Sequence, residues 1–314
     1  SAMYLANPGE QDPVKREANQ KELARIDALM KEKGKTILEE FGMDPGIDLV
    51  LGRKCLDGLD EVQAFHSYGA GFPEKESSNN PIHYKFTWSV IGVMRSYLRP
   101  AVVIKSGADF EVRADEMFSP ANTHILDLPE MGGPLECFPN GDSSHFARAF
   151  GIRETVKDMG RYICRWPGHG AFWEVMARCG FLSDDPIRVG NVEVAPTAFC
   201  ASLLGSQEQF FYGKGERDVA LVRTDARGLK DGKPWRVVCQ VIDKRDLETG
   251  LTSMQRTVGF PASIGAQMIL DGRLDRKGIV SPSEVPFEEF MKELGARGIT
   301  WTREEGPWDG RLEP

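Results

Sequence analysis

The segment from His83 to Ser89 carries the side chains best suited to bind a small polar molecule. Lys85 could pair with a carboxylate, Tyr84 and Ser89 could donate hydrogen bonds, and the aromatic rings between them could exclude water. The same alternation also fits a strand or turn with buried aromatic rings and a solvated lysine. The segment by itself leaves both interpretations open.

Two further segments place polar residues at the expected start of a helix. In the run Phe138–Ser144, Asp142 or Ser143 is suited to cap the following helix, and capping alone would explain both. His169 follows a strand-like run and precedes a helix-like one, so its imidazole could act as a general acid or base. Because the sequence shows no partner for it, we favour a histidine satisfied within the turn.

Two more turns are candidate ligand-binding positions. The helix start at Ser253–Phe260 could bind an anion, because free backbone amides and the helix dipole favour negative charge there. A capped amphipathic helix with an exposed Arg256 fits equally well. The turn Gly42–Gly46 directly follows a short apolar strand, which is where α/β proteins usually present ligands.

Helices and strands are mixed among the elements that would position these segments. Hydrophobic periodicity and turn residues predict helices at 13–33, 47–56, 172–179, 254–270 and 286–294, with Asp12 as the cap of the first. They predict strands at 36–41, 61–68, 101–105, 162–166, 218–224, 235–241 and 299–302, with a loop at Gly69–Pro73. Strict strand–helix alternation is absent, so we expect an α+β or α/β fold with a mixed sheet.

The composition is that of a folded protein. The 314 residues carry 47 acidic and 39 basic side chains, a net charge of −8, and 41% are hydrophobic. The basic patch that nucleic-acid binding usually needs is missing. No run approaches the roughly 20 apolar residues of a membrane span, and no secretory signal is visible. Six dispersed cysteines fit a reducing, cytoplasmic setting.

The common cofactor signatures are also missing. No Gly-x-Gly-x-x-Gly run lies between a strand and a helix, and no glycine-rich loop ends in Gly-Lys-Ser/Thr. The five histidines and six cysteines show none of the paired spacing typical of zinc sites. The motifs alone therefore identify neither a nucleotide nor a metal.

Taken in order, several segments resemble the saccharopine dehydrogenase family, in particular its glutamate-forming branch, the saccharopine reductases. The likeness extends from about residue 35 to the C-terminus. It rests on the runs Gly42–Asp48, Ser77–Pro81, Tyr84–Ser89, Pro139–Ser143, Arg165–Gly168 and Met254–Gly259. Their order and spacing together are more specific than any one of them.

The resemblance implies a domain organisation and an activity. Residues 1–41 would be the end of a Rossmann-type nucleotide domain, residues 42–260 a mixed-sheet catalytic and dimerisation domain, and residues 261–314 a helix and strand that return to the Rossmann domain. The implied activity, in lysine or other amino-acid metabolism, is hydride transfer between NADP(H) and the C–N bond of an opine-type secondary amine. Such an amine forms from an amino acid and a carbonyl partner. The implied assembly is a homodimer.

The resemblance also implies site residues. Carried over by position, Asp44, Pro45 and Gly46 would lie beside the nicotinamide. The substrate cavity would be lined by Tyr84, Lys85, Ser89, Asn140 and Arg256. Cations and directional donors suit a substrate with several carboxylates, and the cofactor would supply the redox chemistry. No catalytic acid or base is identified.

The sequence departs from the family pattern at three places. The glycine-rich phosphate loop is missing, and Ile91 and Gly141 stand where the pattern has arginines. Neither can replace a bidentate carboxylate donor. The substrate therefore stays open, with a less acidic opine or a polyamine-type amine as candidates, and so does NAD versus NADP. The alternative function is a non-catalytic, dimeric ligand-binding or scaffold module without a nucleotide domain.

Overall fold

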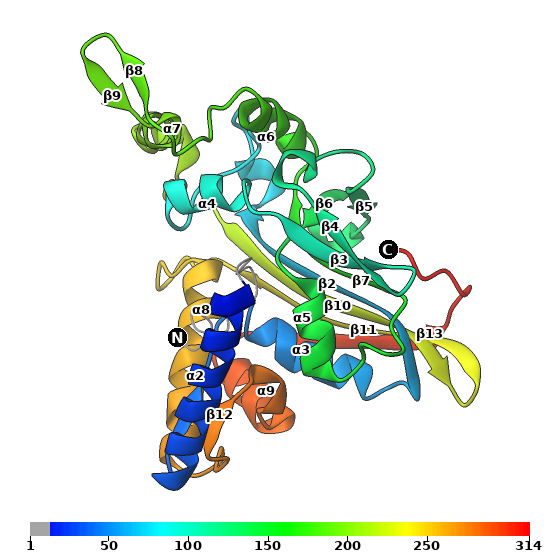
Figure 1. Cartoon of the computed structure of the whole chain (residues 1–314). Helices are drawn as coiled ribbons and strands as arrows, with labels where there is room; N and C mark the ends of the chain where they lie inside the picture. Colours follow the sequence, from blue (N-terminus) through cyan, green and yellow to red (C-terminus); the bar gives the residue numbers. More distant parts are fainter. Residues whose placement is uncertain (1–12) are drawn as a thin grey trace.

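A nine-stranded mixed sheet forms the centre of the computed structural model, which describes residues 13–314 (Figure 1). Across the sheet the order is β13 (Trp301–Pro307), β11 (Lys233–Lys244), β10 (Asp218–Lys230), β2 (Glu61–Pro73), β7 (Asp158–Arg165), β3 (Ala101–Lys105) and β4 (Ala108–Val112). Beside this path, β6 (Leu135–Pro139) pairs with β7, and β5 (His124–Leu126) pairs with β6. β2 and β7 are parallel, and the other pairs are antiparallel. The mixed sheet confirms the predicted fold class.

Strand β2 extends to Pro73, beyond the predicted end at residue 68, so the prediction of a loop at Gly69–Pro73 is wrong. These residues continue the strand because β10 pairs with it residue by residue, up to Asp218 opposite Pro73. A Cβ on Gly69 would collide with the carboxylate of Asp44, and one on Gly71 would collide with Met254. The two glycines therefore let Asp44 and Met254 pack closely against strand β2, and they do not form a turn.

One face of the sheet is covered by helices α3 (Ile47–Leu56), α5 (Ser143–Phe150) and α8 (Ser253–Leu270) (Figure 1). The core between them and the sheet includes Leu51, Phe65, Val222 and Ile264. Helix α3 has the predicted bounds, because its apolar positions follow the helical period and most of them are buried. Within the described residues, no helix combines the length and hydrophobicity needed to cross a bilayer.

A small lobe lies beside the large sheet (Figure 1). Its two parallel strands are β1 (Thr36–Leu38) and β12 (Gly278–Val280), and its helices are α2 (Pro13–Glu32) and α9 (Phe287–Ala296), with α8 alongside. The Asp27 carboxylate of α2 accepts a hydrogen bond from Ile279 N at 2.9 Å. The last strand, β13, pairs with β11 in the large sheet and not with this lobe. Asp12, the predicted cap of the first helix, lies outside the described residues.

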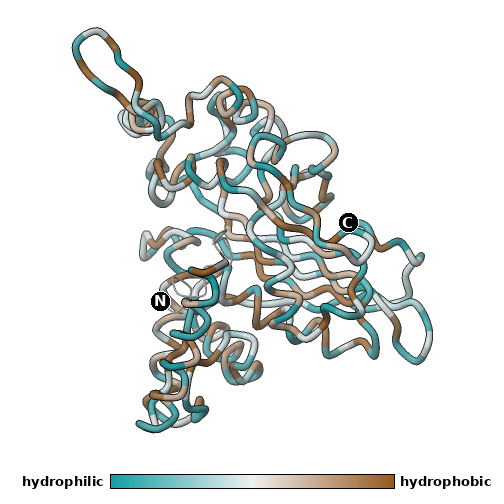
Figure 2. Tube along the Cα trace, in the orientation of Figure 1, coloured by the Kyte–Doolittle hydropathy of each residue, from teal (hydrophilic) through white to brown (hydrophobic). Residues whose placement is uncertain are grey.

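A second group of elements packs at the other end of the sheet, and part of it projects as an arm (Figure 1). It comprises α4 (Val90–Ser96), α6 (His169–Arg178), α7 (Pro196–Gly205), and the hairpin of β8 (Ile187–Val189) and β9 (Val192–Val194). Short 3₁₀ helices lie at Lys75–Ser77, Ala114–Glu116, Pro129–Met131, Glu208–Phe210 and Pro282–Glu284. Hydrophobic residues alternate with polar ones along the projecting hairpin (Figure 2). Periodicity did not predict this hairpin, because its strands are shorter than the four to eight residues that such patterns need.

Candidate functional site

The turn between β1 and α3 holds Asp44 over the large sheet. The Asp44–Pro45 peptide bond is cis, and Gly42 N donates to Pro45 O at 3.0 Å. Gly46 has a φ of 143°, a conformation that favours glycine, and a Cβ there would collide with Gly42. Asp44 and Pro45 stay partly exposed, whereas Gly46 is buried. The turn is therefore a closely packed support that presents two of its residues.

Charged groups surround the Asp44 carboxyl, which packs against Gly69 of β2. Loss of solvation, together with the nearby Asp48 carboxylate, raises the pKa of Asp44 to about 7, although Arg161 and Arg165 oppose the rise. A carboxyl with a pKa near neutrality can both donate and accept a proton at physiological pH. Asp44 therefore has the properties of a proton-exchanging group.

This pKa makes the stability depend on pH. Between the ordinary pKa of 3.8 and about 7 the folded protein keeps a proton that the unfolded chain has lost, so stability falls as pH rises through this range. The shift corresponds to at most about 4 kcal/mol, and partial exposure reduces it to about 2 kcal/mol. We expect Asp44→Asn to be more stable than the parent protein at pH 8 by that amount and similar to it at pH 4. Urea unfolding at both pH values would measure this, and an equal difference at both would contradict it.

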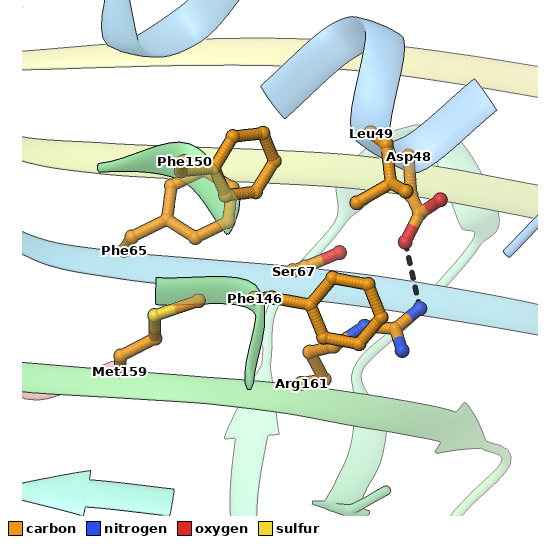
Figure 3. A pocket seen from close by; sticks show the side chains of 8 residues that line it. All are labelled: Asp48, Leu49, Phe65, Ser67, Phe146, Phe150, Met159 and Arg161. Atoms are coloured by element: carbon orange, nitrogen blue, oxygen red, sulfur yellow. Dashed lines mark hydrogen bonds and ion pairs between the residues drawn. The ribbon is translucent and has the colours of Figure 1, made fainter. Parts of the chain in front are cut away.

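A buried ion pair lies beneath the turn. Arg161 Nη2 donates to Asp48 Oδ2 at 2.7 Å, and Asp48 Oδ1 accepts from Gly46 N at 2.8 Å. Figure 3 shows the pair beside Phe146, whose ring centroid lies 4.1 Å from the Arg161 guanidinium carbon. The seam between these residues and Phe65 leaves no room for a water molecule. The pair therefore fixes the turn to the sheet and offers no space for a ligand.

The two cations predicted to bind substrate already have partners. Lys85 Nζ donates to both carboxylate oxygens of Glu216, at 2.6 and 2.7 Å. Arg256 Nε and Nη2 donate to the two oxygens of Asp243, at 2.8 and 3.1 Å, and Nη2 also donates to Arg297 O. Arg256 therefore connects α8 with β11 and with the end of α9. The contacts of both cations with a substrate remain predictions.

The other three predicted substrate residues differ in their surroundings. Tyr84 is buried, and its hydroxyl has no hydrogen-bond partner among the described residues. Ser89 is exposed and caps α4, because its Oγ accepts from Gly92 N at 3.2 Å. Asn140 is partly exposed at the end of β6, and its backbone amide donates to Arg161 O at 2.8 Å. Ser89 thus has a structural role, and Tyr84 keeps a free donor.

Two of the structural interpretations made from the sequence are confirmed. Asp142 caps α5, because its carboxylate accepts from His145 N at 3.0 Å. His169 is buried, with Nε2 2.7 Å from the Tyr97 hydroxyl and Nδ1 2.9 Å from Ile82 O. Burial holds the pKa of His169 well below its usual range, so this imidazole stays neutral.

The possible anion site at the start of α8 is filled by the chain itself. The buried Asp218 carboxylate accepts from Ser253 N at 2.9 Å and from Ser253 Oγ at 2.7 Å. Thr252 and Gln255 add a capping box at the same end of the helix. The backbone amides that could bind an external anion are therefore already used.

Arg165, at the end of β7, received no role in the sequence analysis. It is buried, and its guanidinium carbon lies 4.7 Å from the centroid of the Tyr84 ring. It also lowers the pKa of Asp44, so it is close enough to the turn to interact with that carboxyl electrostatically. The only sequence signal was its place in the run Arg165–Gly168, which contributed to the family resemblance.

A roomier cavity, of about 430 Å³, lies on the opposite face of the sheet. Its lining includes His124, Asp158 and Tyr162, and the last two alternate along β7 with Arg161, so they point away from the turn.

No group of three or more His, Cys, Asp or Glu able to hold a metal occurs in residues 13–314.

Comparison with known protein families identifies the family to which this chain belongs. The family model described as "Saccharopine dehydrogenase C-terminal domain" matches residues 42–299, which is most of the chain and includes both the turn and Arg165. The chain belongs to this saccharopine dehydrogenase family. The resemblance predicted from the sequence is thereby confirmed.

Individual relatives of the saccharopine dehydrogenase family are distant in sequence. Bovine mitochondrial alpha-aminoadipic semialdehyde synthase is 24% identical over 342 residues, which cover 89% of this chain and 36% of that protein. The chain thus spans about a third of the length of such relatives. The saccharopine dehydrogenase [NADP(+), L-glutamate-forming] of Schizosaccharomyces pombe is 24% identical over 346 residues, covering 88% of this chain and 75% of that protein.

Two solved structures share the fold. Apo saccharopine dehydrogenase (L-Glu forming) from Saccharomyces cerevisiae superposes with a TM-score of 0.77 at 24% identity, over 90% of this chain and 77% of that one. Homospermidine synthase from Legionella pneumophila, in complex with NAD, superposes with a TM-score of 0.58 at 11% identity, over 95% of this chain and 70% of that one.

Proposed function

We propose that this chain supplies the substrate-binding and proton-exchanging part of an oxidoreductase. The reaction is hydride transfer between NADP(H) and the C–N bond of an opine-type secondary amine. The observation that carries the proposal is Asp44, a partly exposed carboxyl with a pKa of about 7 on a rigid turn. That turn lies within the matched family region, whose relatives include enzymes named as NADP(+)-dependent saccharopine dehydrogenases.

The residues of the turn fit a flat cofactor ring. Asp44 and Pro45 present partly exposed surface on which a nicotinamide could lie, and Gly46 shapes the turn from below. The bound cofactor would give or accept the hydride. Asp44 would exchange a proton with the substrate nitrogen, and the Asp48–Arg161 pair would hold Asp44 in position.

The pyrophosphate of the cofactor would need a nucleotide domain. The described residues contain no glycine-rich phosphate loop. We assign the lobe of β1, β12, α2 and α9 to the end of such a domain, which takes in most of the predicted ranges 1–41 and 261–314. Residues 42–260 form the catalytic part, and β13 joins its sheet instead of the lobe. The proposed assembly is a homodimer in the cytoplasm.

The test is an assay of the chain joined to a nucleotide domain of its family, with the chain alone as control. We expect NADPH oxidation that requires both an amino acid and a carbonyl compound. Asp44→Asn should lower kcat by about 100-fold or more, because a positioned acid–base group contributes that much. NADPH affinity measured by fluorescence should change far less than kcat, because the amide keeps the shape of the surface on which the nicotinamide would lie. Tight NADPH binding without turnover, across amino-acid and carbonyl pairs, would instead support the ligand-binding module.

A further inference from the structure

The cavity of about 430 Å³ on the face of the sheet away from Asp44 is lined by side chains that the proposed reaction does not use. Its volume lies in the range of small-molecule pockets, about 300–1,000 Å³. Strands β3 and β7, the residues leading into β5 and the C-terminal residues 313–314 form its walls. The last wall is held by the buried Arg227, whose Nη1 donates to the backbone oxygens of residues 311, 312 and 313.

Two opposite charges line this cavity from neighbouring strands without forming an ion pair. The antiparallel register of β3 and β7 places Lys105 directly opposite Asp158, and the Cβ atoms of such neighbours are usually about 4.5–5.5 Å apart. The two side chains nevertheless turn to different partners. Asp158 Oδ1 lies 2.7 Å from Nε2 of the buried His66. Lys105 Nζ lies 4.6 Å from the centroid of the Phe110 ring, and Lys105 has no ion pair within residues 13–314.

Tyr162 adds a polar group that has no partner of its own. This residue of β7 is 8% exposed and lines the cavity, and its hydroxyl forms no hydrogen bond with any described residue. A Cβ on Gly160 would collide with the hydroxyl, so the glycine gives the phenol room to fold back along the strand. Asp158 precedes Gly160 by two residues on the same face of β7. The hydroxyl and the carboxylate are therefore presented from one row of residues.

The rest of the lining is neutral and largely apolar. The ring of His124 packs against the ring of Tyr162, with centroids 4.5 Å apart. Burial lowers the pKa of His124 to about 4, so its imidazole carries no charge at pH 7. The aliphatic side chain of Val103 lines the cavity from β3. The charged groups of the lining are the carboxylates of Asp158 and Glu313 and the ammonium group of Lys105.

We propose that this cavity binds a free α-amino acid with an apolar side chain. The ammonium group of the ligand would pair with Asp158, and its carboxylate would accept from Lys105 and from the Tyr162 hydroxyl. Its side chain would pack between His124 and Val103. Two opposite charges on one carbon atom match two opposite charges on neighbouring strands, whereas a ligand with a single charge would use only one of them. The inference goes beyond the proposed function, because this ligand lies on the other face of the sheet from Asp44.

The test is calorimetric titration of the chain at pH 7 with L-leucine and with two analogues that each lack one charged group, 4-methylpentanoate and 3-methylbutylamine. We expect leucine to bind at least 10-fold more tightly than either analogue. Asp158→Asn should weaken leucine binding on the order of 10–100-fold and Lys105→Met about 10-fold, as the loss of a charge-assisted hydrogen bond does. Tyr162→Phe should weaken it less. Lys157→Met, which removes an exposed lysine outside the cavity, should leave it unchanged.

The Lys105→Met protein separates this site from folding effects and from the proposed substrate site. Lys105 is exposed and has no ion pair to lose, so this variant should melt at the temperature of the parent protein. An amino acid bound near Asp44 would bind equally to the parent and to Lys105→Met, because the two sites lie on opposite faces. Equal leucine affinity of these two proteins would therefore overturn the inference. So would an absence of leucine binding, or an analogue that binds as tightly as leucine.

Discussion

Replacement of Arg161 by methionine is expected to destabilise the protein by about 3–5 kcal/mol, the range measured when one partner of a buried ion pair is removed. Asp48 would remain as a buried carboxylate, 2% exposed, in a seam that has no room for water. Its carboxylate would keep only the backbone amides of Gly46 and Leu49 as hydrogen-bond partners among residues 13–314, and neither carries a positive charge. Urea unfolding of the chain at pH 7 would measure the loss.

The double variant Arg161→Met/Asp48→Asn is the control for this prediction. It removes both charges and keeps side chains of similar size, so most of the lost stability should return. If the double variant were as unstable as the sum of the single variants, the pair would contribute through packing alone. The contact of Arg161 with the Phe146 ring would then explain the effect.

Asp225→Asn is expected to cost about 3–4 kcal/mol at pH 7, because one buried carboxylate serves two arginines. Arg236 donates to it at 2.9 and 2.6 Å, and Arg227 at 3.3 and 3.0 Å. Burial alone would raise the pKa of Asp225, but the hydrogen bonds from both arginines hold it well below its usual range. The amide would leave the buried Arg227 without an anion.

The pH dependence identifies the mechanism of this effect. Because the folded-state pKa of Asp225 is lowered, its contribution is complete above the ordinary value of 3.8 and is lost as pH falls below it. The difference between the parent and Asp225→Asn proteins should therefore shrink between pH 5 and pH 2. Asp184→Asn is the matched control, since Asp184 pairs with Arg95 at the surface and should cost less than about 1 kcal/mol. A constant difference for Asp225→Asn at all pH values would contradict the electrostatic explanation.

Local features of this protein followed from its sequence. The bounds of α3, the strand at Ala101–Lys105, and the cap of α5 depend on apolar spacing and on residues within one turn, so short windows contain the needed information. The ordered runs from Gly42 to Gly259 likewise identified the saccharopine dehydrogenase family.

The tertiary structure decided which charged groups are free. Lys85 meets Glu216 across 131 residues, and Asp48 meets Arg161 across 113, so no spacing rule could pair them. Strand β2 extends through Gly69–Pro73 only because β10 pairs with it there. Glu216 pairs with Lys85 and Asp243 pairs with Arg256, so neither cation is free, and this property belongs to the folded chain because it depends on what surrounds each residue in space.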